Sequence, residues 1–249
     1  MRTNLSEREH FLPSAGLDLD SYLKHGDIAG VHHVIRYLWA IEVIANGPQL
    51  GSVLDVACGS GYGSAAIAQR FPHLKVLGVD IDPTATKHAQ KNYRRSNLRF
   101  KVGDVCQWEA TIGSELFDCI ISFDTIEHIS HREIMLQNIV DHMHPDSFLL
   151  LSTPANYEPK LHPDWSAHRI EYSFLHLYDF LHRYFGQILR PEDSSLPQLQ
   201  VFDRLKGSPV SYWLNMNPLL CQDPIQIDNP YGGAQPAAKK PRRSLFSRT

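Results

Sequence analysis

Short apolar runs alternate with amphipathic segments from residue 51 onward. Continuous apolar runs are typical of strands buried on both faces, whereas apolar positions spaced three and four apart are typical of helices. This alternation predicts an α/β fold: a Rossmann-like, doubly wound and mostly parallel seven-stranded sheet with helices on both faces. The runs expected as strands lie at residues 52–57, 75–80, 98–104, 117–123, 147–153, 187–190 and 209–216.

The segments around these runs indicate how the chain is divided. Residues 28–46 carry apolar side chains at helical spacing, so residues 1–48 are expected to form an N-terminal helical cap over the sheet. Residues 49–222 contain the sheet, and residues 223–249, which are small, proline-containing and basic, are expected to be a disordered tail.

One connection stands out because of its length. Residues 153–173 include three prolines and show neither a strand nor a helix pattern. A connection of about twenty residues inside a compact domain is usually functional, commonly as a wall or lid of an active site. His162 and His168 lie in this loop, and His168 is the preferred functional candidate of the two.

Charge and composition narrow the partners. The chain has 249 residues and a formal net charge of −3, but five basic residues and no acid lie in its last eleven residues. Removing those five charges leaves −8 for the remainder, which disfavours nucleic acid as a partner. The sequence shows no apolar span, no signal peptide and no paired cysteine motif, so a cytoplasmic location is expected.

The segment VLDVACGSGYGS, residues 53–64, is the most informative stretch of the chain. A predicted strand leads into Gly59, Gly61 and Gly63 and then into a predicted helix, so the backbone can turn tightly and approach a ligand. A glycine loop by itself is shared with dinucleotide-binding proteins. Asp55, four residues before Gly59, and the lack of a second dehydrogenase domain argue against the dinucleotide reading.

The spacing Asp-x-x-x-Gly-x-Gly-x-Gly resembles the first motif of class I S-adenosylmethionine-dependent methyltransferases. By this resemblance Asp55 is the motif's acid, and the acid that ends the next strand, Asp80, binds the ribose hydroxyls with Ile81 beside it. The resemblance further implies that Asp104 and Val105 contact the adenine. It also implies that Phe123 and Asp124 face the methionine part of the donor, whose carboxylate Arg36 and Tyr37 reach.

The stretch SFDTIEHISH, residues 122–131, follows the fourth run and is expected to start a helix. Together with the later His-x-x-Glu-aromatic segment it resembles the small-RNA 2′-O-methyltransferases, in which two acids and two histidines hold a divalent cation. The matching residues are Asp124, Glu127, His128 and His168, with Asp124 in place of a longer glutamate. Such ligands suit manganese, iron, cobalt or zinc better than magnesium. Without a metal, Glu127, His128 and His168 are the candidate catalytic acids and bases. A purely structural alternative is that the acids Asp124 and Glu127 only stabilise the start of the expected helix.

The expected function follows from these sites. The first hypothesis is an S-adenosylmethionine-dependent O-methyltransferase acting on a small hydroxylated acceptor such as a sugar, a glycan or a natural-product intermediate. The alternatives are a metal-using RNA ribose 2′-O-methyltransferase and a non-catalytic cofactor-binding partner subunit. A homodimer is a possible assembly.

Overall fold

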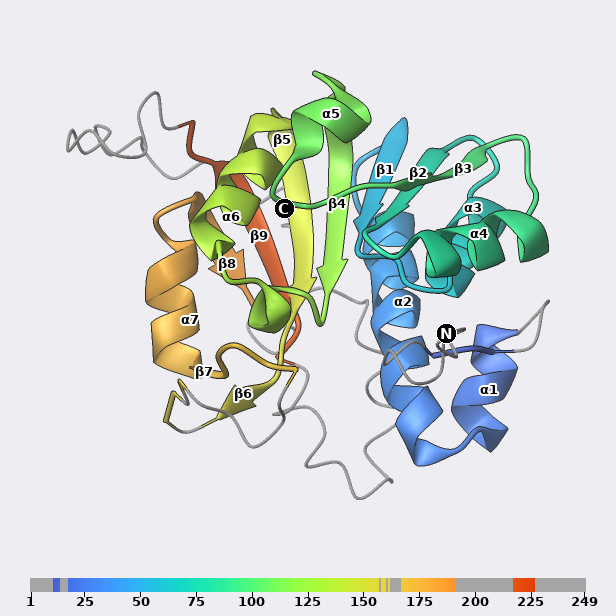
Figure 1. Cartoon of the computed structure of the whole chain (residues 1–249), viewed down its shortest axis with the longest axis horizontal. Coiled ribbons are helices and arrows are strands. Elements are labelled where there is room, and N and C mark those ends of the chain that lie inside the picture. The colour runs from blue at the N-terminus through green and yellow to red at the C-terminus, as the bar shows by residue number, and fades with distance from the viewer. Residues whose placement is uncertain are drawn as a thin grey trace.

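A computed structural model describes residues 11–13, 18–156, 158–159, 161, 167–190 and 217–226 of the chain. These residues form a seven-stranded sheet with helices on both faces (Figure 1), which confirms the predicted fold class. In chain order the elements are α1 (Leu19–His25), α2 (Ile28–Asn46), β1 (Ser52–Val56), α3 (Tyr62–Arg70), β2 (Lys75–Asp80), α4 (Pro83–Asn92), β3 (Leu98–Val102), α5 (Trp108–Ile112), β4 (Phe117–Phe123), the 3₁₀ helix η2 (Ile126–His128), α6 (Arg132–Asp141), β5 (Met143–Ser152), β6 (Ala155–Asn156), β7 (Tyr172–Ser173), α7 (Phe174–Leu181), β8 (Phe185–Leu189) and β9 (Leu219–Pro224).

The order of strands across the sheet is β3-β2-β1-β4-β5-β9-β8. The first five strands of the chain are parallel, whereas β9 runs antiparallel to both β5 and β8. After β1 the chain builds β2 and β3 on one side, and it then returns to place β4 on the other side of β1. In open α/β sheets a ligand binds at such a switch point, outside the carboxyl ends of the strands. The topology therefore predicts a ligand site at the carboxyl ends of β1 and β4.

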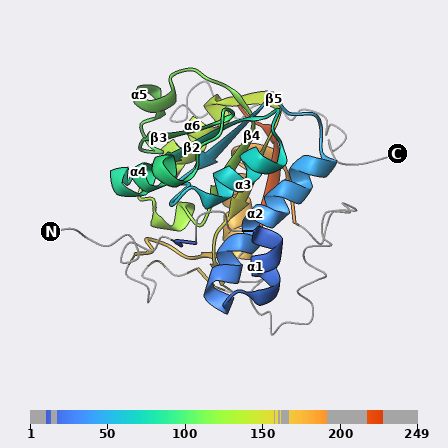
Figure 2. The same cartoon turned by 90° about the vertical axis from the view of Figure 1, so that its right-hand side faces the viewer.

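Two apolar cores, one on each face, hold the helices on the sheet. Buried side chains of α2, α3 and α4 pack in one core with Val53, Cys119 and Phe148 of the sheet. Side chains of α5, α6 and α7 pack in the other core with Leu54 and Ile120. Neighbouring positions of one strand thus face opposite cores, as the two-residue period of a strand requires. The helix α1 packs against α2 (Figure 2), and no described helix is both long and apolar enough to cross a membrane.

The last strand lies elsewhere than the sequence predicts. It spans Leu219–Pro224, and the expected segment 209–216 is outside the described residues. The apolar run in LLCQDP is short and ends in polar residues, so its strand character depends on pairing with β5 and β8. The expected start of the tail at residue 223 consequently falls inside β9, and residues 227–249 are outside the described residues.

The long loop after β5 contains more regular structure than its sequence indicates. Residues 155–156 form β6, which pairs in parallel with β7, so that Ala155 is opposite Tyr172. This pairing brings the two ends of the loop together below the sheet's carboxyl edge (Figure 1). His162 lies outside the described residues, whereas His168 is described.

Candidate active site

The glycine loop joins β1 to α3 at the switch point of the sheet. Gly59 and Gly61 have φ angles of 56° and 83°, a left-handed backbone that favours glycine. A Cβ atom on Gly61 would lie 2.5 Å from the Cβ of Ala89 in α4. Gly63 differs, because it lies within α3 and a Cβ atom there would collide with the ring of Tyr37. Two glycines therefore shape the turn, and the third allows α2 and α3 to pack closely.

Asp55 lies beneath this loop rather than at its surface. Its carboxylate is fully buried and accepts hydrogen bonds from Ser64 Oγ at 2.5 Å and from the hydroxyl of Tyr37 at 3.1 and 3.2 Å. Burial raises the pKa of Asp55 to about 7, against the lowering effect of these two hydrogen bonds. Tyr37 was expected to reach the donor's carboxylate, but its hydroxyl is engaged by Asp55. Both side chains therefore support the loop from below.

The acid that ends β2 and the acid two residues after β3 also hold the backbone in place. Asp80 accepts hydrogen bonds from the amides of Gly59 at 2.7 Å and Asp82 at 2.8 Å, so it ties the end of β2 to the glycine loop. Each carboxylate oxygen has further acceptor capacity for a ligand. Ile81 beside it is 66% exposed, which is unusual for such an apolar residue. Asp104 accepts from the amide of Cys106 at 2.8 Å.

At the end of β4, Asp124 is bonded to two neighbouring elements. Arg36 Nη2 of α2 lies 2.5 Å from Asp124 Oδ2, and Ser152 Oγ of β5 donates to Asp124 Oδ1 at 2.9 Å. Arg36 is itself buried, and its Nη1 donates to the carbonyl of His32 at 2.7 Å. Asp124 has a left-handed backbone with φ of 46°, a conformation that aspartate tolerates better than most residues. The ring of Phe123 packs edge-on against that of Tyr37.

Next to Asp124 lies a second acid, Glu127, whose side chain is fully buried. It lies in η2, a 3₁₀ helix of three residues, where the sequence predicts the start of a longer helix; the helix α6 begins only at Arg132. Thr153 donates to Glu127 Oε2 at 2.8 Å, and Glu127 Oε1 has no hydrogen-bond partner among the described residues. Burial and the nearby charge of Asp124 raise the pKa of Glu127 well above its ordinary value.

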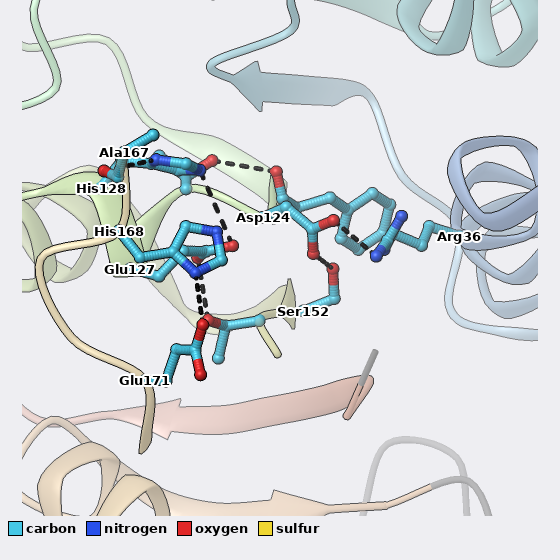
Figure 3. Close-up of polar contacts among 11 residues, drawn as sticks. Arg36, Asp124, Glu127, His128, Ser152, Ala167, His168 and Glu171 are labelled. Atoms are coloured by element: carbon cyan, nitrogen blue, oxygen red, sulfur yellow. Dashed lines mark hydrogen bonds and ion pairs between the residues drawn. The ribbon is translucent and has the colours of Figure 1, made fainter. Parts of the chain in front are cut away.

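His168 folds back from the long loop to meet this turn. The amide of Arg169 donates to the carbonyl of Glu127 at 2.6 Å, which fastens the loop to η2. The ring centroids of His128 and His168 lie 4.9 Å apart, and the two ring planes make an angle of 78°. Figure 3 shows these two imidazoles and the Glu127 carboxylate facing each other, with Asp124 and Arg36 farther toward α2. One ligand atom from each of Glu127, His128 and His168 lies within 4.8 Å of the other two.

The neighbours of the two histidines determine which ring nitrogen carries the proton. His128 Nδ1 lies 3.1 Å from the carbonyl oxygen of Ala167, which can only accept, so Nδ1 donates. His168 Nδ1 lies 2.8 Å from Glu171 Oε1, which likewise orients that ring. In both neutral rings the lone pair is then on Nε2. His128 Nε2 faces Glu127 Oε1 at 3.9 Å.

The donor set of this cluster fits a divalent cation. Two imidazole nitrogens and one carboxylate oxygen suit manganese, iron, cobalt or zinc. A histidine that binds a metal typically donates its other N–H to a carbonyl or a carboxylate, as His128 and His168 do here. The orphaned Oε1 of buried Glu127 would gain a partner. Of the four predicted ligands, the structure brings together Glu127, His128 and His168. Asp124 is outside this group, because Arg36 and Ser152 hold its carboxylate.

Three residues that support the site were not predicted as site residues. Thr153 holds Glu127, Ser152 holds Asp124 and Glu171 orients His168. Glu171 had a sequence signal, because it is the acid of the His-x-x-Glu-aromatic segment. Ser152 ends β5 next to β4 and Thr153 follows it, so only the strand pairing reveals their role.

The fold and this arrangement define a class of protein. A glycine loop at the switch point, acids at or just after the ends of β2, β3 and β4, and one antiparallel strand, β9, between β5 and the edge strand β8 are features of a Rossmann-like domain that binds a nucleoside cofactor. Residues 53–146 match a family model described as a methyltransferase domain. This match supports the expected class I S-adenosylmethionine-dependent methyltransferase domain for the part of the chain that holds the glycine loop and β1 to β4.

Individual relatives agree with this family. Trans-aconitate 2-methyltransferase of Deinococcus radiodurans is 30% identical over 110 residues, which cover 44% of this chain and 40% of that protein. Ubiquinone biosynthesis O-methyltransferase of Rickettsia prowazekii is 30% identical over 142 residues, 52% of each protein. The chain thus spans about half the length of these curated relatives or less.

Solved structures agree with the fold. The O-methyltransferase from a trans-AT PKS multienzyme of Brevibacillus brevis, in complex with S-adenosyl-L-homocysteine, superposes with a TM-score of 0.54 at 17% identity, covering 86% of this chain and 82% of that one. At this identity the similarity concerns the fold alone.

Proposed function

We propose that this chain transfers the methyl group of S-adenosylmethionine to a hydroxyl oxygen of a small acceptor, such as a sugar or a glycan or natural-product intermediate. The observation that carries the proposal is the cluster of Glu127, His128 and His168 beside the carboxyl end of β4. An activated methyl group needs little chemical help, but an alcohol must lose its proton as it attacks. The cluster supplies groups that can take up that proton.

The donor would lie across the ends of β1 to β4. In this proposal the amides of the glycine loop approach the donor, Asp80 accepts from its ribose hydroxyls and Ile81 packs against its adenine. Asp104 and Val105 would contact the adenine from the end of β3. The exposure of Ile81 and the spare acceptor capacity of Asp80 support these roles.

The methionine part of the donor would lie near Phe123, Asp124 and Arg36. Arg36 is buried at the switch point, and its Nε atom has no hydrogen-bond partner among the described residues. An anion there would satisfy this atom, and the donor's carboxylate is such an anion. Asp55 and Tyr37 would act indirectly, through the loop that they support.

Proton removal has a structural basis in the two histidines. Because Nδ1 of each ring donates to a fixed acceptor, the basic nitrogen of each neutral ring is Nε2. Glu171 would stabilise the positive charge that His168 acquires when it takes a proton. General-base catalysis of this kind contributes about 10²–10⁴-fold to rate. Alignment of the acceptor with the methyl group supplies the rest of the catalysis.

A divalent cation would be held by Glu127, His128 and His168. When bound, it would supply Lewis acidity, which lowers the pKa of a coordinated hydroxyl and so eases its deprotonation. The protein's own contribution in that case is to orient both imidazoles through Ala167 and Glu171 and to place Glu127 through Thr153.

The proposal is tested by incubating the chain with a ¹³C-methyl donor and a panel of hydroxylated acceptors, followed by mass spectrometry of the products. A label on oxygen of a small acceptor, lost in His168→Gln, is the expected result. Exclusive transfer to nitrogen or carbon would overturn the assignment to oxygen. Selective methylation of an RNA oligonucleotide in the panel would favour the ribose hypothesis. Donor binding without transfer to any acceptor would favour a non-catalytic partner subunit.

A further inference from the structure

Arg36 and Asp124 form an ion pair between the two halves of the candidate site. Arg36 Nη2 lies 2.5 Å from Asp124 Oδ2, and the exposed fractions of the two side chains are 7% and 25%. On one side of the pair is the switch point where a donor would bind. On the other side is Glu127, close enough that the charge of Asp124 raises its pKa. In Figure 3, Asp124 lies between Arg36 and the group of Glu127, His128 and His168.

The polar contacts of Arg36 within the described residues involve only its two terminal nitrogens. Its Nη1 donates to His32 and its Nη2 is paired with Asp124, whereas Nε has no partner among the described residues. A carboxylate that binds arginine in a bidentate manner commonly takes Nε and one terminal nitrogen together. A ligand carboxylate that binds along this edge competes with Asp124 for Nη2. It also brings a second negative charge beside Asp124, which repels that side chain.

Asp124, once released, has an alternative partner nearby. The cluster of Glu127, His128 and His168 offers three donor atoms within 4.8 Å of one another, and a cation there attracts a further carboxylate. The other acceptor interaction of Asp124, with Ser152 Oγ at 2.9 Å, involves Oδ1 and does not require Arg36.

We propose that Asp124 is an exchangeable residue which couples the two binding events: the donor's carboxylate takes Arg36, and Asp124 is then free to join a divalent cation held by Glu127, His128 and His168. This inference rests on the proposed donor and cation sites. Coupling through one shared partner is reciprocal, so the cation strengthens donor binding by the same factor as the donor strengthens cation binding. Couplings of this kind typically amount to about 5–150-fold, and we expect about tenfold here.

The test uses the full chain, Co²⁺ and S-adenosylhomocysteine, which has the carboxylate of the donor but no methyl group to transfer. Calorimetry gives the Co²⁺ affinity with and without saturating S-adenosylhomocysteine, and visible absorption of Co²⁺ reports a change in its ligands. The matched control ligand is 5′-methylthioadenosine, which retains the nucleoside and the thioether but lacks the amino-acid part. S-adenosylhomocysteine should tighten Co²⁺ binding about tenfold and alter the spectrum, whereas methylthioadenosine should do neither.

Two substitutions should change the coupling between nucleoside binding and Co²⁺ binding in different ways. Asp124→Asn, which tolerates the left-handed backbone at this position, should still bind Co²⁺ but without any effect of S-adenosylhomocysteine. Arg36→Gln should bind Co²⁺ more tightly than the wild type when no nucleoside is present, because Asp124 is already released. If Arg36→Gln does not fold, the comparison of the two nucleosides on the wild type decides the question.

The outcomes separate this inference from the proposed function. No binding of S-adenosylhomocysteine would contradict the donor site itself. Binding of both ligands with independent affinities would overturn the coupling while leaving the methyltransferase proposal intact. Binding of S-adenosylhomocysteine without any Co²⁺ binding would also overturn it, and would leave the histidines as bases. Equal coupling by methylthioadenosine would show that the amino-acid part, and hence Arg36, is not involved.

Discussion

Replacing Asp55 by asparagine should make the stability of the protein less dependent on pH. Asp55 is fully buried beneath the glycine loop, and burial raises its pKa from an ordinary value of 3.8 to about 7. Asparagine has nearly the same shape and can still accept from Ser64 Oγ, but it has no charge to bury. The substitution therefore tests the cost of the charge with little change in packing.

The direction in which the free energy of unfolding changes with pH follows from proton binding by Asp55. Between pH 3.8 and about 7 the folded chain keeps a proton on Asp55 that the unfolded chain has lost, so the free energy of unfolding falls as pH rises through this interval. Each pH unit is worth about 1.4 kcal/mol, which gives an upper limit of about 4 kcal/mol of lost stability at pH 8. Asp55→Asn should be free of this loss. The variant should therefore gain stability relative to the wild type from pH 5 to pH 8.

Urea unfolding at pH 5, 6, 7 and 8 measures this difference. Other groups titrate in the same range: burial lowers the pKa of His33 to about 4 and raises that of Glu127. Their effects are common to both proteins and cancel in the comparison. Asp141→Asn, at an exposed carboxylate of α6, is the matched control and should parallel the wild type. A constant difference between Asp55→Asn and the wild type at all four pH values would refute the reasoning.

Further variants test the candidate site directly. Asp80→Asn should weaken S-adenosylhomocysteine binding in calorimetry by about tenfold or more, since it removes charged acceptors for the ribose hydroxyls and for the amide of Gly59; unchanged affinity would exclude the ribose role. His168→Gln should lower kcat by about 10²–10⁴-fold with little effect on donor binding, and equal losses in both would make the residue structural. Glu171→Gln should lower kcat less than His168→Gln does, because the amide oxygen can still accept from His168 Nδ1 and only the charge beside the ring is lost; an unchanged kcat would argue against a role for Glu171 in catalysis. Treatment with a chelator should abolish methyl transfer if the cluster works with a metal, and adding back single metals should restore it. If the chelator changes neither the activity nor the content of bound metal, a metal-dependent mechanism is excluded.

Much of the sheet was predictable because its strands are locally encoded. The runs that became β1, β2 and β4 are apolar and continuous, since a central parallel strand is buried on both faces whatever its neighbours are. The edge strand β3 (LRFKV) instead alternates, with Leu98 and Phe100 buried. The strand β9 was not predictable in the same way. Its sequence LLCQDP has only a short apolar run, and it becomes a strand because β5 and β8 offer hydrogen-bond partners on either side.

The candidate site was predictable to the extent that its residues end strands. Asp80 and Asp104 end predicted strands and Asp124 directly follows one, so the parallel sheet had to bring them to one edge. Their hydrogen-bond partners were not predictable. The sequence gives no indication that Tyr37 donates to Asp55 or that Arg36 holds Asp124, because α2 can place either residue in these positions only once it is packed on the sheet.

The sequence by itself determined the class of fold, the glycine loop and the set of titratable residues at the carboxyl edge, since periodicity and glycine content act over short distances along the chain. The tertiary structure alone decided which of these residues meet. His168 joins Glu127 and His128 because the amide of Arg169 binds the carbonyl of Glu127 across the long loop, and Asp124 stays apart because a buried arginine from another element neutralises it. A carboxylate's role depends on the nearest opposite charge, and that neighbour is a property of the folded chain.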